Sequence, residues 1–281
     1  MNKETLKNKV KEHWNNNPMD YDNIKSKKYS KEYYDEINKQ FQNVHFFAKK
    51  KKKKLFSKII NYKNIKNKTV LIIGCGCGTL TTEMVKSGAK VTAIDITPTA
   101  IKNTKRQLKE NKLKAIVFEA DAEQLPFKNE SFDFVWSWGV IHHTPNTKKA
   151  AQEILRVLKK GCHAKVMIYH KNSIFYYILI MFIRGILQGK LLFQKPQELL
   201  NKYTDHSHKG GTPLGKTYTS NQAKKLFSGS KNIKTQVYGL RNELYFIPHI
   251  RNMCYKLPDL IPKLILEKLR LGWFLVLKIK K

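Results

Sequence analysis

The sequence predicts an α/β fold with a doubly wound, mainly parallel sheet. Two observations support this: aliphatic runs of strand length recur from residue 68 onward, and segments with helical periodicity or capping signals separate them. Strands that alternate with helices of this length are typical of βαβ units. The expected strands are residues 69–73, 90–95, 115–120, 132–137 and 164–169, followed by a final pair at 233–238 and 273–279.

Capping signals predict the helices between these strands. Thr97 is a good N-cap and Pro98 suits the first helical position, so a helix is expected from there to about residue 111. Residues 81–87 and 146–160 are each followed by glycine, which commonly ends a helix, and both are expected to be helical. Near the N-terminus, apolar residues at helical spacing predict one more helix, which ends at a run of three asparagines.

Four segments are expected along the chain, because the alternating pattern begins near residue 66 and ends near residue 170. Beyond it, residues 174–192 form an apolar helical stretch, residues 195–216 are polar and loop-like, and residues 222–227 and 260–271 are expected to be helical. The four segments are an N-terminal helical lid (1–65), the core (66–170), a substrate cap inserted after the fifth strand (171–232) and the final strand pair with its intervening helix (233–281).

The charge of the chain is extreme. It carries 54 Lys and Arg residues against 21 Asp and Glu, a formal net charge of +33. Such a charge favours nucleic acid, anionic membrane surfaces and acidic ligands as partners. The lysines are spread along the whole chain together with frequent Asn and Ile, which indicates compositional bias more than one binding face. The run Lys49–Lys54 is concentrated, and is either a solvated segment or a contact with anionic lipid.

The sequence shows no pattern typical of a secreted or membrane-spanning protein. Four cysteines in 281 residues do not make a disulfide framework. The first residues lack the apolar stretch of a signal peptide, and no run approaches the roughly 18 apolar residues of a spanning helix. A cytoplasmic protein is therefore expected, with peripheral contact at the inner face of the membrane as a further expectation.

A glycine-rich loop follows the first expected strand. Gly74, Gly76 and Gly78 let a ligand lie close against the backbone. Their G-x-G-x-G spacing differs from the dinucleotide fingerprint G-x-G-x-x-G/A, whose third small residue would stand at Thr79. Asp95 ends the next strand, where a carboxylate can accept hydrogen bonds from both hydroxyls of a ribose. The loop and the acid alone predict a nucleoside-containing ligand and leave NAD open.

Two further segments narrow the choice of ligand. Asp121 follows the third strand, where it can accept from an amino group such as adenine N6 or can simply stabilise a turn. With the exit of the fourth strand added, the sequence resembles the class I S-adenosylmethionine-dependent methyltransferases, in the branch that includes the ubiquinone- and menaquinone-biosynthesis type. The resemblance runs through the Gly74–Gly78 loop, Asp95 with Ile96–Thr99, Asp121–Ala122 before Leu125–Phe127, Trp136–Thr144 and Glu153–Gly161.

The resemblance implies a Rossmann-like, seven-stranded sheet whose last strand is antiparallel, and S-adenosylmethionine as co-substrate without a metal. Asp95 would hold the ribose, and the glycine loop would border the methionine part of this molecule. Cys75 and Cys77 are expected to be small fillers of the loop, since their spacing is tighter than that of a zinc pair. The implied cofactor-binding residues are Gly74, Cys75, Gly76, Gly78, Asp95, Ile96, Asp121, Ala122, Ser137 and Trp138.

Candidate catalytic residues stand near the ends of the fourth and fifth strands. An acceptor that must lose a proton is helped by a base within hydrogen-bond reach. His142, His143 and Tyr169 follow or end these strands, on the side where such folds hold their sites, and are therefore the candidates. A purely structural role, holding the loop, is the alternative for the paired histidines.

Three functions compete for this sequence. A methyltransferase acting on oxygen, nitrogen or carbon of a small-molecule or lipidic acceptor fits the apolar stretch after residue 174, which offers a pocket or an interfacial surface unless it is a core helix. An RNA methyltransferase fits the charge of +33, but the fourth strand ends in Ser137–Gly139 and not in the Asn/Asp-Pro-Pro-aromatic turn used for base amino groups. An NAD oxidoreductase or a non-methylating binder is disfavoured by the position of Gly78. The first function is the prediction, with RNA as the alternative.

Overall fold

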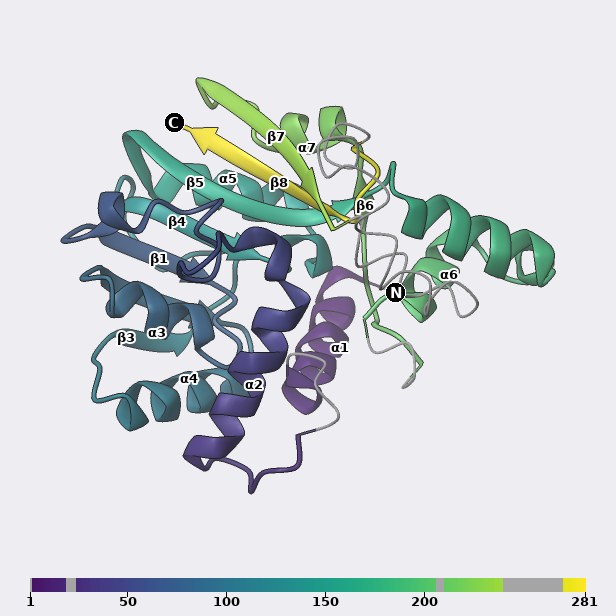
Figure 1. The fold of residues 1–281 in the computed structure, drawn as a ribbon. Coiled ribbons are helices and arrows are strands. Elements are labelled where there is room, and N and C mark those ends of the chain that lie inside the picture. Colours follow the sequence, from purple (N-terminus) through teal and green to yellow (C-terminus); the bar gives the residue numbers. More distant parts are fainter. Residues whose placement is uncertain (1, 19–23, 206–209, 240–269) are drawn as a thin grey trace.

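A mixed sheet forms the centre of the molecule. In the computed structural model of the chain, residues 2–18, 24–205, 210–239 and 270–281 are described. Their strands form an eight-stranded sheet in the order β3-β2-β1-β4-β5-β8-β7, with the short β6 paired to β5 (Figure 1). The strands are β1 Thr69–Ile73, β2 Lys90–Asp95, β3 Ile116–Glu119, β4 Phe132–Trp138, β5 Leu158–His170, β6 Thr217–Tyr218, β7 Asn232–Tyr238 and β8 Phe274–Lys280.

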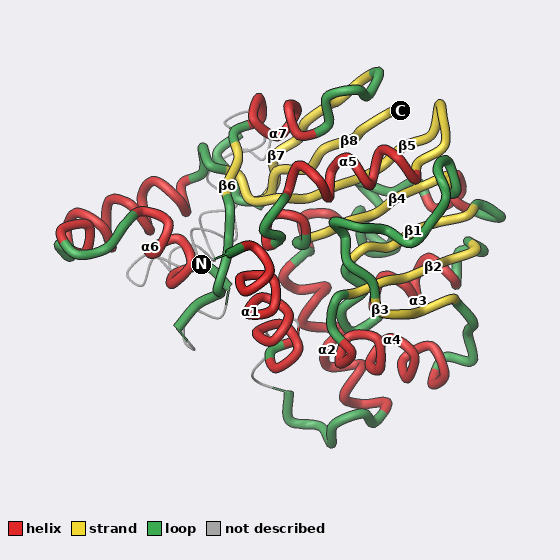
Figure 2. The backbone as a smooth tube through the Cα atoms, turned by 180° about the vertical axis from the view of Figure 1, so that it is seen from behind, coloured by secondary structure: helices red, strands yellow, loops and turns green. Residues whose placement is uncertain are grey.

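Helices cover both faces of this sheet, as the view from behind also shows (Figure 2). One buried core joins α3 and α4 to the first face, and a second joins α5 and α7 to the other. The α-helices are α1 Lys3–Asn16, α2 Lys31–Val44, α3 Thr79–Val85, α4 Pro98–Glu110, α5 Thr147–Val157, α6 Pro196–Tyr203 and α7 Ser220–Leu226. A π-helix, η5 Phe175–Leu187, and the short 3₁₀ segments η2 Phe46–Ala48, η3 Tyr62–Ile65, η4 Ile141–His143 and η6 Lys190–Leu192 complete the helical elements of the described residues.

The aliphatic run of β1 explains why the centre of the sheet is parallel. Val70 and Ile72 pack into the core on the α3 side, whereas Leu71 and Ile73 pack into the core on the α5 side, and all four are buried. A strand covered by helices on both faces needs apolar residues at every position and not at alternate ones. β1 pairs in parallel with both β2 and β4, as the sequence predicts.

The far edge of the sheet is antiparallel. β8 lies between β5 and β7 and runs antiparallel to both, so the last strand of the chain is inserted next to the parallel half. The predicted Rossmann-like sheet with an antiparallel last strand is confirmed. The two-residue β6 is an addition that the sequence did not predict.

The predicted junction between α5 and β5 is wrong. The helix expected at residues 146–160 ends at Val157, and β5 begins directly at Leu158, well before the expected residue 164. Leu158 is fully buried and pairs with Phe132 of β4, so burial of this side chain outweighs the helical continuation up to Gly161. The two strands then shift register between Phe132 and Phe134, which takes up the difference.

Two helices lie where none was predicted. Ser30 caps α2 by accepting from the Tyr33 amide at 3.2 Å, within the predicted N-terminal helical lid, of which only the first helix was predicted individually. α6 lies in the stretch expected to be a polar loop. It begins at Pro196, is capped by Glu198, which accepts from the Lys195 amide at 2.9 Å, and buries Leu199 and Leu200. The helix expected at residues 260–271 falls almost entirely outside the described residues, and the four-segment division of the chain stays a prediction.

The apolar stretch predicted after residue 174 forms η5 and η6. These elements project away from the sheet together with α6 (Figures 1 and 2). Among the helices of the described residues, none is both long enough and apolar enough to cross a membrane.

Arg156 of α5 fixes the loop that follows β3. Its guanidinium donates to the carbonyl oxygens of Leu125 at 2.9 Å and Phe127 at 2.6 Å. It also forms a two-pronged pair with Glu153, at 2.7 and 2.8 Å, and Glu153 in turn accepts from the Leu125 amide. Only the planar, five-donor guanidinium can make this set of bonds at once. We call Arg156 with these bonds the Arg156 clamp. It holds the loop beside Asp121 against the sheet.

We expect Arg156→Met to lower the free energy of unfolding by about 2–4 kcal/mol, because two carbonyls and a carboxylate lose charged donors. Arg156→Lys should cause a smaller but still clear loss, since a lysine ammonium cannot form the two-pronged pair with Glu153. Urea unfolding is the measurement, and Lys148→Met, an exposed cation on the same helix, is the control and should shift stability by less than about 0.5 kcal/mol. Equal midpoints for Arg156→Met and Lys148→Met would contradict the clamp.

Candidate active site

The glycine loop bends sharply over the carboxyl end of the sheet. The amides of Gly74 and Cys75 both donate to the carbonyl oxygen of Ile94 in β2, at 2.8 and 3.0 Å. Gly74 has φ +78°, and a Cβ there would lie 2.1 Å from a methyl group of Val140. Gly78 has φ +87°, and a Cβ would lie 2.9 Å from the Thr104 Cα. Backbone conformation and space therefore both require glycine at these two positions.

Asp95 lies beside this loop at the end of β2. One carboxylate oxygen accepts from the Gly76 amide at 3.2 Å, and the other accepts from the amide and the hydroxyl of Thr97, both at 3.0 Å. A carboxylate offers about four acceptor positions, so it can accept from one more hydroxyl without losing these partners. Burial raises the pKa of Asp95 above its ordinary value, while the Gly76 and Thr97 donors lower it.

Asp121 lies next to Asp95 because their strands are joined at the carboxyl edge. The Ala120 amide donates to the Asp95 carbonyl oxygen at 2.9 Å. One Asp121 oxygen accepts from the Glu123 amide at 2.8 Å, and the other accepts from the Lys7 ammonium at 2.6 Å. The structure thus brings the two acids of the predicted adenosine site to one edge, with Ile96 and Ala122 directly following them in the chain.

The N-terminal helix α1 lies across this edge (Figure 1). Besides Lys7, it contributes Lys11, which pairs with Glu119, and Asn15, whose side-chain oxygen accepts from the Thr99 amide at 3.1 Å. Helix α2 is fastened on the other side of the loop. Its Asn38 accepts from the Thr79 hydroxyl at 2.6 Å and from the Gln107 amide group at 2.9 Å. The two N-terminal helices therefore border the predicted cofactor site directly.

Trp138 and Ser137 point to opposite faces of β4. The indole N–H of Trp138 donates to His45 Nε2 at 3.0 Å, and the ring stacks on Trp136 with centroids 5.1 Å apart. His45 has its other nitrogen 2.9 Å from the Phe41 carbonyl oxygen, so it is the Nδ1–H tautomer. Ser137 is fully buried, and its hydroxyl has no partner among the described residues. Of Ser137 and Trp138, both predicted to bind the cofactor, Trp138 is thus held by an aromatic cluster.

The loop cysteines are inert in this setting. Both are buried, and burial raises the pKa of Cys75 well above its ordinary value and that of Cys77 to about 12. Protonated thiols are neither nucleophiles nor metal ligands. Among residues 2–18, 24–205, 210–239 and 270–281, no cluster of three or more His, Cys, Asp or Glu side chains is arranged to hold a metal ion.

The three catalytic candidates meet in one cluster beyond the glycine loop. The ring of His142 lies 4.2 Å from that of His143 and 3.9 Å from that of Tyr169, centroid to centroid. His142 is fully buried, and neither of its ring nitrogens has a partner among the described residues. Burial lowers the pKa of both histidines, and the neighbouring His143 lowers that of His142 further.

Asp205 joins this cluster, although the sequence did not predict it. The Tyr169 hydroxyl donates to one of its carboxylate oxygens, and His143 Nε2 lies 3.6 Å from the other. His143 Nδ1 lies 2.6 Å from the Leu214 carbonyl oxygen and so carries its hydrogen. Asp205 stands in a polar stretch without a motif, 62 positions after His143, and only the fold brings it there. The result is a chain of three titratable groups at the ends of β4 and β5.

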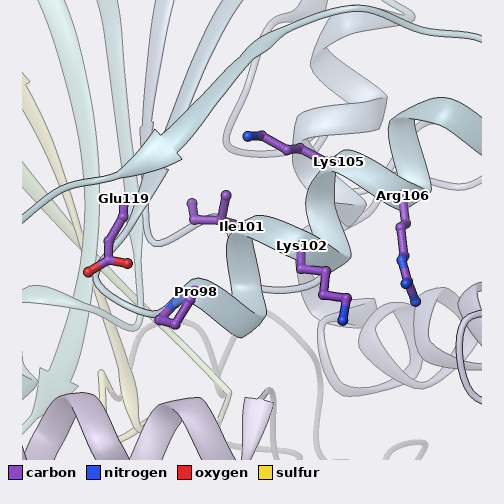
Figure 3. Close-up of a pocket in the computed structure, with 6 residues that line it drawn as sticks. All are labelled: Pro98, Ile101, Lys102, Lys105, Arg106 and Glu119. Carbon is purple, nitrogen blue, oxygen red and sulfur yellow. The ribbon is translucent and has the colours of Figure 1, made fainter.

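A surface pocket of about 350 Å³ lies outside the sheet edge that is predicted to bind adenosine. Figure 3 shows Pro98 and Ile101 beside Glu119, with three cationic side chains further along α4. Glu119 is the register partner of Asp95, so the pocket opens next to the predicted ribose position. The residues that line it are Pro98, Ile101, Lys102, Lys105, Arg106 and Glu119.

Comparison with known proteins agrees with this geometry. Residues 71–164 match the family model described as "Methyltransferase domain", and this segment contains the glycine loop, both acids and the β4 exit. These residues are a class I, S-adenosylmethionine-dependent methyltransferase domain. S-adenosylmethionine is therefore the co-substrate that the domain type uses.

Individual relatives show how far the similarity extends. An uncharacterized protein of Methanocaldococcus jannaschii is 34% identical over 61% of this chain and 61% of its own length. A ubiquinone biosynthesis O-methyltransferase of Nitrosomonas europaea is 31% identical over 48% of this chain and 61% of its own. The chain thus covers less than two thirds of either relative. The crystal structure of an S-adenosylmethionine-dependent methyltransferase from Mesorhizobium loti has the same fold, with a TM-score of 0.51 at 16% identity over 77% of this chain and 92% of its own.

We expect stability to fall on acidification, in part through His45. Burial lowers the pKa of folded His45 to about 4, against an ordinary value of 6.5. The unfolded chain therefore takes up this proton first, and the free energy of unfolding should decrease by roughly 1.4 kcal/mol per pH unit from this residue between pH 6.5 and pH 4. Urea unfolding of the wild type and His45→Phe at several pH values measures the slope. The variant should show a shallower dependence, and an identical slope in both proteins would contradict a neutral His45.

Proposed function

We propose that the chain is a methyltransferase that moves the methyl group of S-adenosylmethionine to a small-molecule or lipidic acceptor. The observation that carries the proposal is the carboxyl edge of the sheet, where the glycine loop lies against Asp95 and next to Asp121. Two carboxylates can accept from a ribose and from an adenine amino group. The relative that acts in ubiquinone biosynthesis supports an acceptor of this class.

The residues at this edge suit a ligand without phosphate. Asp95 has an acceptor position left, and Asp121 accepts a hydrogen bond from Lys7 that a ligand amino group can replace. An additional negative charge beside these two acids would be repelled. Bound S-adenosylmethionine would supply a methyl group already activated by its sulfonium, so the chain has chiefly to align the acceptor and exclude water.

The Tyr169–Asp205–His143 chain is our candidate for the proton acceptor. His143 carries its hydrogen on Nδ1, so its lone pair on Nε2 faces an Asp205 oxygen. Burial lowers the pKa of His143, but the nearby Asp205 charge acts against this and favours a proton on Nε2. A proton released by an acceptor hydroxyl or carbon acid can therefore be held by this pair, with Tyr169 orienting Asp205 from its other oxygen. Both ring nitrogens of the neighbouring His142 lack a partner among the described residues, which indicates that this region can receive a polar group of the acceptor.

Two features bear on the kind of acceptor. The apolar η5 begins five residues after the end of β5, so an apolar element is attached directly to the Tyr169 side of the site. The formal charge of +33 favours an anionic surface, and we include peripheral contact with an anionic membrane in the proposal. The RNA alternative gains no support, because the matched domain covers the core alone and no RNA-binding module is recognisable beside it.

We expect Asp95→Asn to weaken S-adenosylmethionine binding by about tenfold to a hundredfold, because a charged acceptor of a ribose hydroxyl is replaced by a neutral one. Isothermal calorimetry with S-adenosylmethionine gives the affinity. Asp133→Asn is the matched control, since this carboxylate binds Thr69 and Lys159 at the opposite edge of the sheet. Equal affinities of the two variants for S-adenosylmethionine would contradict the assignment of Asp95 to the cofactor site.

We expect Asp205→Asn to leave S-adenosylmethionine affinity within about twofold of the wild type but to reduce methyl transfer at least tenfold. Labelled donor and a lipid extract provide the transfer assay. A second measurement needs no acceptor: the Asp205 charge raises the pKa of His143, so in the variant NMR should show that His143 stays neutral to a lower pH. Asp35→Asn, an exposed carboxylate on α2, is the control. Unchanged transfer and an unchanged His143 titration would contradict the assignment.

A further inference from the structure

An apolar hairpin projects from the molecule at the end of β5. It consists of η5 and η6 with their flanking turn, and we call residues Phe175–Phe193 the tip hairpin. Figures 1 and 2 both show η5 extending away from the sheet. Gly185 lets the two arms touch, since a Cβ there would lie 2.7 Å from a methyl group of Leu191. Gly189, with φ +63°, makes the turn between them.

The tip hairpin exposes large apolar side chains to an extent that the rest of the described chain does not. Leu192 and Phe193 are 81% and 87% exposed, and Leu187 is 66% exposed. Single exposed apolar residues are ordinary, but a contiguous group marks an interaction surface. The exposed members are Tyr177, Ile178, Phe182, Ile186, Leu187, Leu192 and Phe193.

The π-helical geometry of η5 collects these side chains on one side. In a π-helix the backbone bonds join residues five apart, so side chains four or five positions apart stand above one another. The exposed residues of η5 have this spacing: Tyr177 and Ile178 are followed by Phe182, and Phe182 by Ile186 and Leu187. An α-helix would distribute the same five residues around its axis. The opposite side is packed, with Ile180 and Gly185 buried.

The charges around the tip hairpin are mostly positive. Between Lys171 and Tyr203 the sequence has five basic residues and one acidic residue, Glu198. Arg184 and Lys190 both stand over the ring of Tyr203, at 5.2 and 4.7 Å from its centroid. Glu198 is occupied in capping α6. A partner with an apolar interior and an anionic surface therefore complements both the exposed apolar side chains and the basic residues of the tip hairpin.

We propose that the tip hairpin docks on an anionic phospholipid bilayer, with its apolar stripe in the acyl boundary and its cations at the headgroups. The helices of the described residues do not span a membrane, and an apolar stripe flanked by basic residues is typical of interfacial attachment. Each cation near an anionic surface adds attraction that falls off with salt.

The tip hairpin is connected to the proposed acceptor side of the site. Trp273 stacks on Tyr169 with centroids 4.4 Å apart, and the first η5 residue, Phe175, packs on the same indole at 4.8 Å. The docked hairpin would therefore bring the Tyr169 side of the site toward the bilayer that holds an apolar acceptor. This last step rests on the proposed methyl transfer, whereas docking itself does not.

Vesicle co-sedimentation tests the docking with the full chain. Vesicles of phosphatidylcholine with one quarter phosphatidylglycerol should bind the protein, and vesicles of phosphatidylcholine alone should bind it at least tenfold more weakly. The triple variant Leu187→Ser, Leu192→Ser, Phe193→Ser should lose at least tenfold in affinity for the anionic vesicles. Ile116→Ser is the matched control, because Ile116 is 63% exposed on β3, far from the hairpin, and it should bind as the wild type does. Arg184→Gln with Lys195→Gln should weaken binding and reduce its dependence on salt.

Calorimetry with S-adenosylmethionine on the same variants separates this inference from the proposed function. The triple variant should retain the wild-type affinity for S-adenosylmethionine, which also shows that it is folded. Equal vesicle binding by the triple variant and by Ile116→Ser would overturn the docking, whatever the methyl-transfer result. A concentration-dependent dimer that the triple variant loses, without vesicle binding by the wild type, would assign the surface to a second copy of the chain and would equally overturn it.

Discussion

The hydrogen bond from the Gly76 amide to the Asp95 carboxylate joins the ends of β1 and β2, and the candidate site depends on it. It holds the glycine loop bent over the sheet and, in the same contact, fixes one oxygen of the carboxylate beside the loop. The Gly74 and Cys75 amides support the bend by sharing one carbonyl of β2. A loop with side chains at Gly74 or Gly78 could not make this approach, so the backbone and the acid form one unit.

The two halves of the site are assembled in different ways. The predicted adenosine half is local, because the loop, Asp95 and Asp121 each follow a strand of one parallel sheet and meet at its carboxyl edge. The proposed acceptor half is built from distant segments: Tyr169 ends β5, His143 lies in η4, and Asp205 follows α6. Lys7 of α1 also binds Asp121, so a ligand amino group would have to replace this contact with the N-terminal helix.

The predictability of the molecule follows the same division. Buried parallel strands need continuous aliphatic runs, so β1, β2 and β4 could be predicted with boundaries close to those observed. Thr97 and Pro98 predicted the start of α4 for an equally local reason. Asp205 could not be predicted, because no periodicity or motif connects it to His143. The prediction of the junction between α5 and β5 was wrong for a related reason, since Leu158 pairs with Phe132 of β4, which lies 26 positions earlier in the chain.

We propose that Asp95 and the glycine loop receive an adenosyl group without phosphate. A crystal structure of the chain with S-adenosylhomocysteine is the decisive measurement. We expect a ribose hydroxyl within hydrogen-bond distance of Asp95, the adenine amino group on Asp121 in place of Lys7, and the amino acid part of the ligand along Gly74–Gly78. A ribose bound away from Asp95, or a loop that moves to admit the ligand elsewhere, would contradict it.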